Sequence, residues 1–386
     1  MTSSNLQTFS SNNGSINSDR NIRYGVVGLG AFAQSVALPA FSNADNTELV
    51  ALVSGDPTKR RELAQKYGIK NTYSYEEYDD FLRSGNVDAV YITLPNHLHC
   101  EYTVRAAQAG IHVLCEKPMA VTVEECEAMI KAAADNNVKL MIAYRLHLEE
   151  ANLAAVEILR SGNIGEPRIF NSLFTQQTVA GNIRLQKAVG GGTLDDIGIY
   201  CINAARYLFQ DEPIAVFATV ANNGEERFQE VAEMTSAILR FPGDRLATFT
   251  CSFGAAKVDN YQVIGTKGDL KVENAYSIKE DIIHILTVED QIIERIFKTR
   301  DQLAAEFAYF SDCILQNKNV EPSGEEGLID IQIIRALYQS IATGSFVEIN
   351  NTIDRQQRPT IDQTVVVPLT HPEPELINPT SPSGKS

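Results

Sequence analysis

The chain has 386 residues, of which 44% are hydrophobic and 21% are charged, a composition typical of a globular protein long enough for two domains. Its formal net charge is −16, whereas a protein surface that binds nucleic acid needs an excess of Lys and Arg to neutralise phosphates. No apolar run is long enough for a membrane helix, and the six cysteines and six histidines show no zinc spacing. We therefore expect no nucleic-acid partner, no membrane anchor and no metal site.

The first 22 residues are rich in Ser and Asn, and we expect them to be disordered. They contain neither the basic stretch nor the apolar core of a secretory signal. The cysteines are scattered along the chain, which suits a reducing compartment. These features together predict a cytoplasmic location.

Residues 23–146 alternate between short apolar runs and helix-like segments. Continuous apolar runs are typical of strands buried on both faces, and strands that alternate with helices form a parallel sheet. Ligands of such α/β sheets bind beyond the carboxyl ends of the strands. We predict strands at 23–30, 47–55, 87–95, 111–118 and 138–145, and helices at 31–44, 56–68, 73–85, 100–110 and 122–137.

The first strand ends in the turn GLGAFA, residues 28–33, which has the pattern G-x-G-x-x-A. Gly28 permits the tight turn, Gly30 lets the backbone approach a pyrophosphate, and Ala33 allows the next helix to pack closely. A strand before the turn and a helix after it supply the context that this motif requires. We therefore predict a Rossmann domain over residues 23–146 that binds a dinucleotide through Gly28, Gly30, Ala31 and Phe32.

The end of the second strand bears on the choice of cofactor. NAD sites usually place a carboxylate there for the ribose 2′-hydroxyl, whereas this chain has Ser54, followed by Lys59 and Arg60. A serine does not repel a 2′-phosphate, and nearby cations attract it. Asp56 could face the ribose instead, and the basic residues could form a solvated helix face. We predict NADP as the cofactor, with NAD as the alternative, bound by Ser54, Lys59 and Arg60.

A later strand ends in Leu94, Pro95 and Asn96, where a nicotinamide ring could lie against the chain. His97 and His99 follow, but no third residue has the spacing of a metal ligand. We interpret them as loop histidines near a helix start, with His99 lining the cleft.

The next strand, IHVLC, ends in Glu116-Lys117-Pro118. Pro118 fixes its own φ and pushes Lys117 toward an extended conformation. A lysine held in this way at the carboxyl end of a buried strand is placed to contact a ligand.

After residue 146 the pattern changes, because several runs alternate apolar with polar residues, as in an antiparallel sheet with one covered face. We predict a second domain of the α+β class over residues 147–350, with an open mixed or antiparallel sheet. Residues 351–386 are rich in Pro, and we expect a disordered tail. The predicted strands are 165–177, 213–222, 231–241, 245–254 and 260–274, and the predicted helices are 148–162, one starting near 193, 302–317 and 327–344.

The second domain contains the run GGGTLDDIGIY. Its glycines, 190–192, allow a close approach of the backbone to a ligand or cofactor. Asp196 and Tyr200 are four positions apart on a predicted helix and therefore share one face. Spacing alone is equally compatible with a proton-handling pair and with an amphipathic helix whose tyrosine belongs to the core.

The segments VVGLGAFAQ, ALVSGD, LPNHLHCEY, CEKPMA and GGGTLDDIGIY occur in this order and resemble motifs of the Gfo/Idh/MocA oxidoreductases. The resemblance covers about residues 23–350, and within the family it is strongest to the glucose–fructose oxidoreductase type. It implies a Rossmann domain, a second domain with an open mixed sheet, and a homodimer or homotetramer that assembles through that sheet.

The same resemblance implies roles for individual residues. Lys117 would bind the reacting hydroxyl of a sugar, Asp196 would be the family's acid, and Tyr200 its proton-transfer residue. Glu116 and Arg145 match positions at the cofactor and the active cleft. The resemblance also implies a cis peptide bond before Pro118.

The oxidation of a sugar hydroxyl requires a hydride acceptor and a base. A free tyrosine is a poor base at neutral pH, because its pKa is about 10. A neighbouring ammonium group stabilises the phenolate, and Lys117 is the candidate.

We therefore predict an NADP-dependent oxidoreductase that acts on a sugar or polyol. The alternatives are another sugar dehydrogenase or reductase of the family, such as an anhydrofructose reductase or a pyranose 1-dehydrogenase, and a non-catalytic sugar sensor that binds the cofactor.

Overall fold

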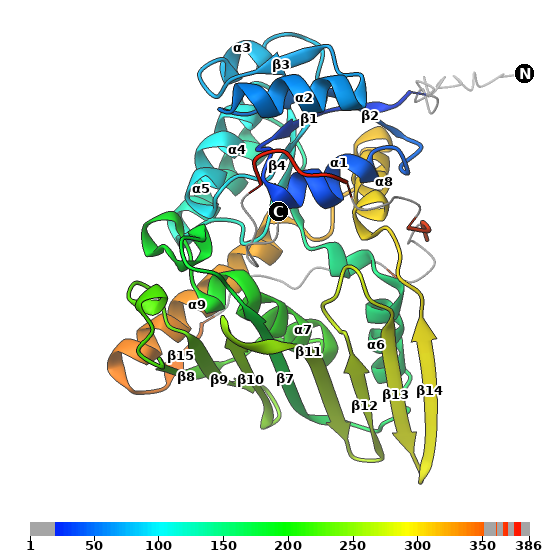
Figure 1. Cartoon of the computed structure of the whole chain (residues 1–386). Coiled ribbons are helices and arrows are strands. Elements are labelled where there is room, and N and C mark those ends of the chain that lie inside the picture. The colour runs from blue at the N-terminus through cyan, green and yellow to red at the C-terminus, as the bar shows by residue number, and fades with distance from the viewer. Residues whose placement is uncertain (1–19, 351–359, 361–365, 370–373, 380–386) are drawn as a thin grey trace, which may run out of the picture.

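The computed structural model describes residues 20–350, 360, 366–369 and 374–379, which form two lobes (Figure 1). The first lobe is built around a six-stranded sheet, and the second around a nine-stranded sheet. Within these residues, no helix combines the length and the apolar character that crossing a membrane requires.

All the strand pairs of the first sheet are parallel, which confirms the predicted α/β class. The strand order is β3-β2-β1-β4-β5-β6, so the direction of winding reverses between β1 and β4. Ligands of such sheets bind at this point, beyond the carboxyl ends of the strands. The strands are β1 Ile22–Val27, β2 Thr47–Val53, β3 Asn71–Tyr73, β4 Ala89–Ile92, β5 His112–Glu116 and β6 Leu140–Ala143.

The helix α2 (Pro57–Tyr67) begins and ends at residues that favour caps. Asp56 accepts hydrogen bonds from the backbone N–H groups of Thr58 and Lys59 at the start of α2, and Gly68, with φ +69°, ends that helix. The predicted helix over 73–85 is wrong in its first part, because residues 71–73 pair with β2 as a three-residue strand too short to show a periodicity. The helices are η1 Ala33–Ala37, α1 Leu38–Ala40, α2 Pro57–Tyr67, α3 Tyr78–Leu82, η2 Asn96–Leu98, α4 His99–Gln108 and α5 Val123–Asp135.

A late helix, α8 (Gln302–Leu315), returns to the first sheet and packs against η1, β1 and β2. The rings of Phe307 and Phe41 stack with centroids 4.2 Å apart. The Tyr24 hydroxyl lies 2.8 Å from that of Ser311 within the same core. The first lobe is therefore completed by residues that come after the second sheet in the sequence.

The second sheet has the order β14-β13-β12-β11-β7-β10-β9-β8-β15, with β10 and β7 parallel and the other pairs antiparallel. This confirms the predicted open mixed sheet. Its strands are β7 Pro167–Gln177, β8 Ala215–Ala221, β9 Met234–Phe241, β10 Arg245–Ser252, β11 Gly254–Gly265, β12 Gly268–Glu273, β13 Ile282–Val288, β14 Gln291–Phe297 and β15 Val347–Glu348.

Three long helices cover the face of this sheet that is turned toward the first lobe (Figure 1). They are α6 (Glu150–Arg160), α7 (Ile199–Phe209) and α9 (Gly324–Thr343). Short helical turns join the elements at η3 Arg145–Leu148, η4 Ile183–Leu185, η5 Lys187–Val189, η6 Leu194–Gly198 and η7 Glu226–Phe228.

Candidate functional site

A cavity of about 390 Å³ opens between the two lobes at the carboxyl ends of β1, β4 and β5. This volume is typical of a site for a small molecule or cofactor. Most of the residues predicted to bind the cofactor line it, as do both residues predicted from the second lobe. The predicted residues that line the cavity are Gly28, Gly30, Ala31, Phe32, Ser54, Lys59, Leu94, Pro95, Asn96, Glu116, Lys117, Arg145, Asp196 and Tyr200.

The glycine turn after β1 forms one end of the cavity. Gly28 has φ +98°, and a Cβ atom at this position would lie 2.6 Å from the carbonyl oxygen of Thr93. At Gly30, by contrast, an added Cβ would meet no atom within 4 Å and would enter the cavity. The helix that follows starts at this turn, and its first backbone N–H groups have no intrahelical acceptor. The turn therefore fits a pyrophosphate group.

The end of β2 forms the next part of the wall. Ser54 and Lys59 line the cavity together with Tyr75, which the sequence analysis did not identify. Arg60 does not line it, because its guanidinium donates to the carbonyl oxygen of Ser54. The Asp56 carboxylate caps α2 through one oxygen, and its other oxygen accepts a hydrogen bond from Asn378, 3.1 Å away.

His99 lies behind the wall rather than in it. Its side chain is fully buried, and its ring nitrogens lie 2.8 Å from the carbonyl oxygen of Leu94 and 2.9 Å from that of Pro118. Burial lowers the pKa of this histidine. His99 thus ties together two loops that follow neighbouring strands, and both loops line the cavity.

Lys117 follows β5 and crosses the cavity to the second lobe. Its Nζ lies 2.8 Å from the backbone oxygen of Asp196 and 3.4 Å from the Oδ1 atom of the same residue. The Lys117–Pro118 peptide bond is cis, which confirms the expectation from the resemblance. The neighbouring Glu116 accepts a hydrogen bond from Tyr91, and burial raises the pKa of Glu116.

The second-lobe wall is built on the π-helical turn η6 and on α7, which follow the glycine run. The Asp196 carboxylate is only 15% exposed and lies between two cations, Lys117 and Arg184, whose Nε is 2.8 Å from Oδ2. Burial alone would raise the pKa of Asp196, but Arg184 and Lys117 outweigh burial and lower it. Asp196 is therefore an ionised carboxylate that holds Lys117 in place.

Tyr200 stands one helical turn beyond Asp196. The Nζ of Lys117 lies over its ring at 4.8 Å from the centroid, and the Arg145 guanidinium carbon lies at 5.2 Å. No described residue forms a hydrogen bond with the Tyr200 hydroxyl, which leaves that group available to a ligand in the cavity. The ammonium group thus faces the ring of Tyr200, an arrangement in which a cation and an aromatic ring attract each other.

Arg145 lines the cavity and is held by hydrogen bonds to two distant segments. It is buried, and its guanidinium donates to Gln302 and, over 2.6 Å, to the carbonyl oxygen of Tyr276. These bonds tie the end of the first lobe to the start of α8 and to the second sheet. These bonds therefore fix Arg145, which places a positive charge close to Tyr200.

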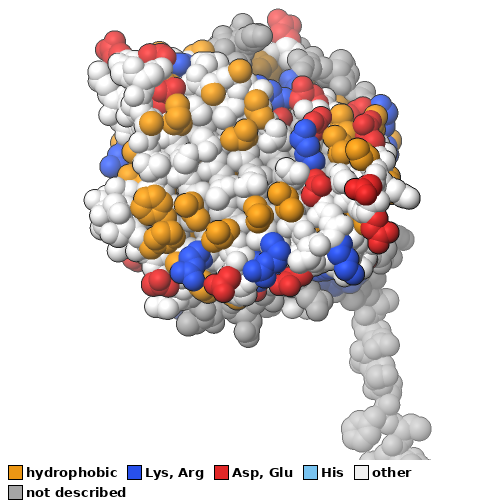
Figure 2. Space-filling model, turned by 90° about the horizontal axis from the view of Figure 1, so that it is seen from below, with side chains coloured by type: hydrophobic (Ala, Val, Ile, Leu, Met, Phe, Trp, Pro, Cys, Tyr) orange, Lys and Arg blue, Asp and Glu red, His pale blue; other side chains and the backbone are white. Residues whose placement is uncertain are grey.

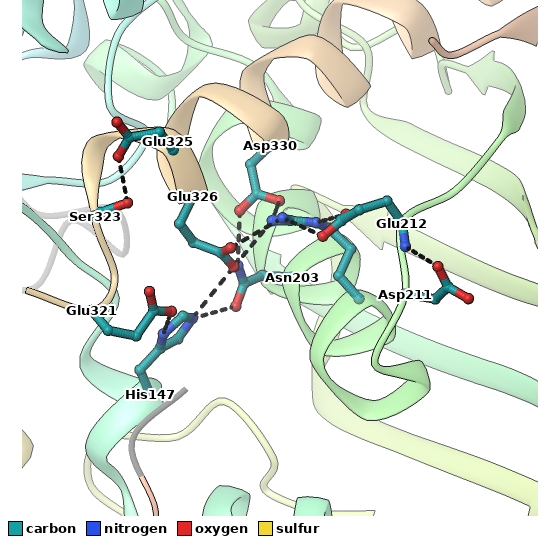
Figure 3. Close-up of polar contacts among 10 residues, drawn as sticks. His147, Asn203, Asp211, Glu212, Glu321, Ser323, Glu325, Glu326 and Asp330 are labelled. Carbon is teal, nitrogen blue, oxygen red and sulfur yellow. Dashed lines mark hydrogen bonds and ion pairs between the residues drawn. The ribbon is translucent and has the colours of Figure 1, made fainter. Parts of the chain in front are cut away.

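A buried ionic network holds α7 against α9 (Figure 3). Asn203 donates to Asp330 over 2.9 Å and to Glu326 over 3.2 Å, and it accepts from His147 over 2.9 Å. Because Asn203 lies one turn beyond Tyr200, the network fixes the helix that presents the tyrosine. Its central cation is the fully buried Arg206, which pairs with Glu212, Glu326 and Asp330.

The helix α9 contacts both walls of the cavity. A Cβ atom on Gly327 would lie 2.9 Å from atoms of Ile142 and Met119, so the helix packs directly on the loop that carries Lys117. At its other end, Tyr338 donates to the buried carboxylate of Asp195, next to Asp196. α9 therefore connects the lysine loop of the first lobe with the acid–tyrosine helix of the second.

Several cavity residues were not identified from the sequence. Arg184 is the most important, because it pairs with Asp196, yet its loop follows no recognisable pattern. Of the glycines 190–192, Gly190 and Gly191 line the cavity, and the carbonyl oxygen of Gly190 also accepts a hydrogen bond of 2.8 Å from Asn96, which joins the two lobes. The other additional lining residues are Leu29, Tyr75, Thr93, Ala143, Phe174, Gln176, Ile183, Val189 and Ile197.

Both parts of the chain match known family models. Residues 22–144 match an oxidoreductase family with an NAD-binding Rossmann fold, and residues 152–271 match the GFO/IDH/MocA C-terminal domain. Among curated proteins, the NADP(+) D-xylose 1-dehydrogenase of Haloarcula marismortui is 35% identical over 340 residues, which cover 86% of this chain and 94% of that protein.

Solved structures of oxidoreductases are also similar to this chain. An aldose-aldose oxidoreductase from Caulobacter crescentus, in complex with glycerol, is 36% identical with a TM-score of 0.82, and the match covers 86% of this chain and 100% of that one. A 3-ketoreductase from Actinomadura kijaniata, in complex with NADP and TDP-benzene, is 28% identical with a TM-score of 0.77, covering 83% and 98%. That ketoreductase has also been solved with one lysine changed to alanine and with one tyrosine changed to phenylalanine. The chain belongs to the Gfo/Idh/MocA family of oxidoreductases.

Proposed function

We propose that this protein is an NADP-dependent oxidoreductase that transfers a hydride between the nicotinamide and a sugar or polyol. The observation that carries the proposal is the meeting of Lys117 with Asp196 and Tyr200 across the cavity, beside the glycine turn. The similarity to a D-xylose 1-dehydrogenase and to an aldose-aldose oxidoreductase supports a sugar as the substrate.

The residues present fit a dinucleotide. The glycine turn would hold the pyrophosphate, Ser54 and Lys59 would hold the 2′-phosphate, and the loop at 94–96 would lie along the nicotinamide half. When bound, the cofactor accepts a hydride from a carbinol carbon or returns one to a carbonyl carbon.

The chain itself supplies proton transfer and orientation. In the direction of reduction, the Tyr200 hydroxyl donates its proton to the substrate oxygen as the hydride reaches the carbon, and in the direction of oxidation the phenolate takes that proton back from the substrate hydroxyl as the hydride leaves. Lys117 donates a hydrogen bond to the reacting oxygen and stabilises the charge that develops there. Asp196, held ionised by Arg184, keeps the lysine aimed across the cavity.

The preference for NADP over NAD rests on the end of β2. Both carboxylate oxygens of Asp56 are engaged, one with the start of α2 and the other with Asn378, so this acid is not free to bind a ribose 2′-hydroxyl. Lys59 supplies a cation at the same corner of the cavity. NAD remains the alternative.

We also propose a homodimer or homotetramer that forms through the outer face of the second sheet. The strand register places Ile169, Leu246 and Ile292 on this face, and they are 41%, 43% and 72% exposed. Figure 2 shows apolar side chains among charged ones on the underside of the molecule. Exposed apolar surface of this extent is typical of an interface. Light scattering should give a smaller molar mass for Ile169→Asp than for the parent. Leu369→Asp, which changes an exposed leucine outside the second sheet, should keep the molar mass of the parent.

The proposed location is the cytoplasm. All six cysteines are free in the structure, and five of them are buried, as expected for a protein kept in a reducing compartment.

The decisive experiment for the reaction is a sugar panel. The purified protein is first checked for bound nucleotide and then mixed with aldoses, ketoses and polyols and with NADP or NAD. We expect a change in the ultraviolet absorbance of reduced nicotinamide with at least one sugar, and faster turnover with NADP. Tight binding of cofactor without turnover on any substrate would instead support the non-catalytic sensor.

A further inference from the structure

Six residues near the C-terminus, 374–379, lie against the first lobe close to the glycine turn and to the start of α2 (Figure 1). We call them the strap. The sequence predicts a disordered tail for the whole of residues 351–386, of which only residues 360, 366–369 and 374–379 are described. The described contacts differ from that prediction, because the buried Gln34 and the partly exposed Asp56 of the first lobe bind the strap.

Ile377 pairs with the side chain of Gln34, which is 1% exposed. The Gln34 amide donates to the carbonyl oxygen of Ile377 over 2.9 Å, and its oxygen accepts from the Ile377 N–H over 2.7 Å. The same amide nitrogen donates to the carbonyl oxygen of Leu29, inside the glycine turn, over 2.9 Å. Gln34 therefore connects the strap to the turn that would hold the pyrophosphate.

The next residue, Asn378, reaches the other corner of the site. Its amide lies 3.1 Å from the Asp56 oxygen that does not cap α2. Asp56 in turn positions the first turn of α2, which carries Lys59 into the cavity. Two consecutive residues of the strap thus reach both parts of the dinucleotide site. Ile377 is connected through Gln34 to the glycine turn, which would hold the pyrophosphate, and Asn378 binds Asp56, at the end of the site that would hold the ribose.

Apolar packing and a second anchor support these bonds. Ile377 packs against the core cluster that contains Leu29, as does Phe32, which lines the cavity. Before the strap, the carbonyl oxygen of Val367 accepts a hydrogen bond of 2.8 Å from the N–H of Asp301, at the start of α8. The tail therefore contacts the first lobe at two places.

We propose that the strap is part of the dinucleotide site, and that Ile377 and Asn378 tighten the binding of NADP by holding the glycine turn and the Asp56 corner in their binding geometry. Loss of the strap leaves the buried Gln34 amide without two hydrogen bonds and frees the Asp56 carboxylate, which disfavours a 2′-phosphate. The inference rests on the proposed use of NADP.

The test compares the full chain with two shortened chains, one ending at Glu373 and one ending at Pro379. NADP and NAD dissociation constants are measured by titration without any sugar, and thermal melts establish that each protein is folded. We expect the chain ending at Glu373 to bind NADP about tenfold more weakly, and the chain ending at Pro379 to match the full chain. Turnover at saturating NADP should stay within about twofold of the full chain.

A point variant separates the strap from a general effect on folding. Asn378→Ala should weaken NADP binding about threefold and NAD binding less, whereas Glu375→Ala, in the same strap, should change neither. Equal NADP affinity for the full chain and for the chain ending at Glu373, or tighter binding by the shortened chain, would overturn the proposal. If the full chain itself binds no NADP, the proposed function fails instead.

Discussion

The two walls of the cavity are built in different ways. The first-lobe wall consists mainly of backbone turns at the ends of parallel strands, where Gly28, Pro95 and Lys117 follow β1, β4 and β5. The second-lobe wall presents its acid and its phenol, Asp196 and Tyr200, on one helical segment, and that segment is held by buried charges on α9. The first wall is therefore specified by local sequence, and the second depends on contacts distant in sequence.

This difference assigns the two walls separate tasks. A wall of turns and N–H groups suits the binding of a cofactor whose shape does not change between reactions. A wall of ionisable side chains, fixed by a satisfied ionic network, suits proton transfer, because its charges are held in place before the substrate arrives. Changes in the glycine turn of the first wall should accordingly affect cofactor binding. Changes in Tyr200, or in the Lys117 side chain that reaches it from the first wall, should affect turnover.

The largest expected effect is on turnover, from the second wall. We expect Tyr200→Phe to lower kcat by about a hundred- to ten-thousand-fold, because the variant lacks the group that takes the proton. NADP affinity should remain within about twofold of the parent. Tyr276→Phe, the same change in a tyrosine that packs on Tyr200 but does not line the cavity, is the control. Nearly normal turnover of Tyr200→Phe would show that the tyrosine only packs.

The next effect concerns the first wall, where two glycines of one motif should behave differently. Gly30→Ala should weaken NADP binding at least about tenfold with little change in melting temperature, because the added methyl group enters the cavity. Gly28→Ala should weaken binding and also lower the melting temperature, because its backbone conformation is left-handed and the Cβ meets Thr93. A Gly30→Ala protein that binds NADP normally would contradict the assignment of the turn.

A smaller effect should follow from the network behind the second wall. Glu326→Gln removes a buried charge that binds Arg206 and Asn203, and we expect it to lower the free energy of unfolding by about 1–3 kcal/mol. We also expect a severalfold decrease in kcat with little change in NADP affinity. The adjacent Glu325→Gln, which alters only a bond to Ser323, should do neither. Equal behaviour of the two variants would show that the network does not position α7.

The smallest effects are changes in the pH dependence of stability, and they should have opposite signs in the two lobes. Burial lowers the pKa of His112, in the first lobe, to about 4, below its value in the unfolded chain. Its contribution to stability is therefore complete above about pH 6.5 and is lost as the pH falls toward 4. Burial raises the pKa of Asp330, in the second lobe, to about 6, so its contribution is complete at low pH and is lost as the pH rises toward 6.

Urea unfolding of His112→Gln and Asp330→Asn between pH 4 and 7 measures both signs. Relative to the parent, the difference in unfolding free energy should grow with pH for the histidine variant. For the aspartate variant it should shrink between pH 4 and 6. Parallel curves for parent and variants would refute the respective assignment.

The sequence predicts what local patterns encode. The glycine turn, the lysine after β5 and the placement of Asp196 and Tyr200 on one helix face all follow from motifs of a few residues, and the cavity brings them together. Arg60 and His99 were expected in the site, but their side chains bind backbone carbonyl groups behind it, because local spacing does not show which partner a polar group will find.

What the sequence does not predict are contacts between distant segments. Arg184 has no motif of its own, and its role is visible only beside Asp196. α8 reads as the end of the second domain but covers the first sheet. The three-residue strand β3 is too short for any periodicity. The strap lies 343 residues from Gln34, in a segment whose composition resembles a disordered tail.

The central claim is that an amine from the first wall and a phenol from the second act together on one substrate oxygen. A double-mutant cycle on kcat/KM, with Lys117→Ala, Tyr200→Phe and the combined variant, tests it most directly. We predict that the combined variant is about as slow as the slower single variant, because either change disables the same step. Independent effects that multiply in the combined variant would contradict the account.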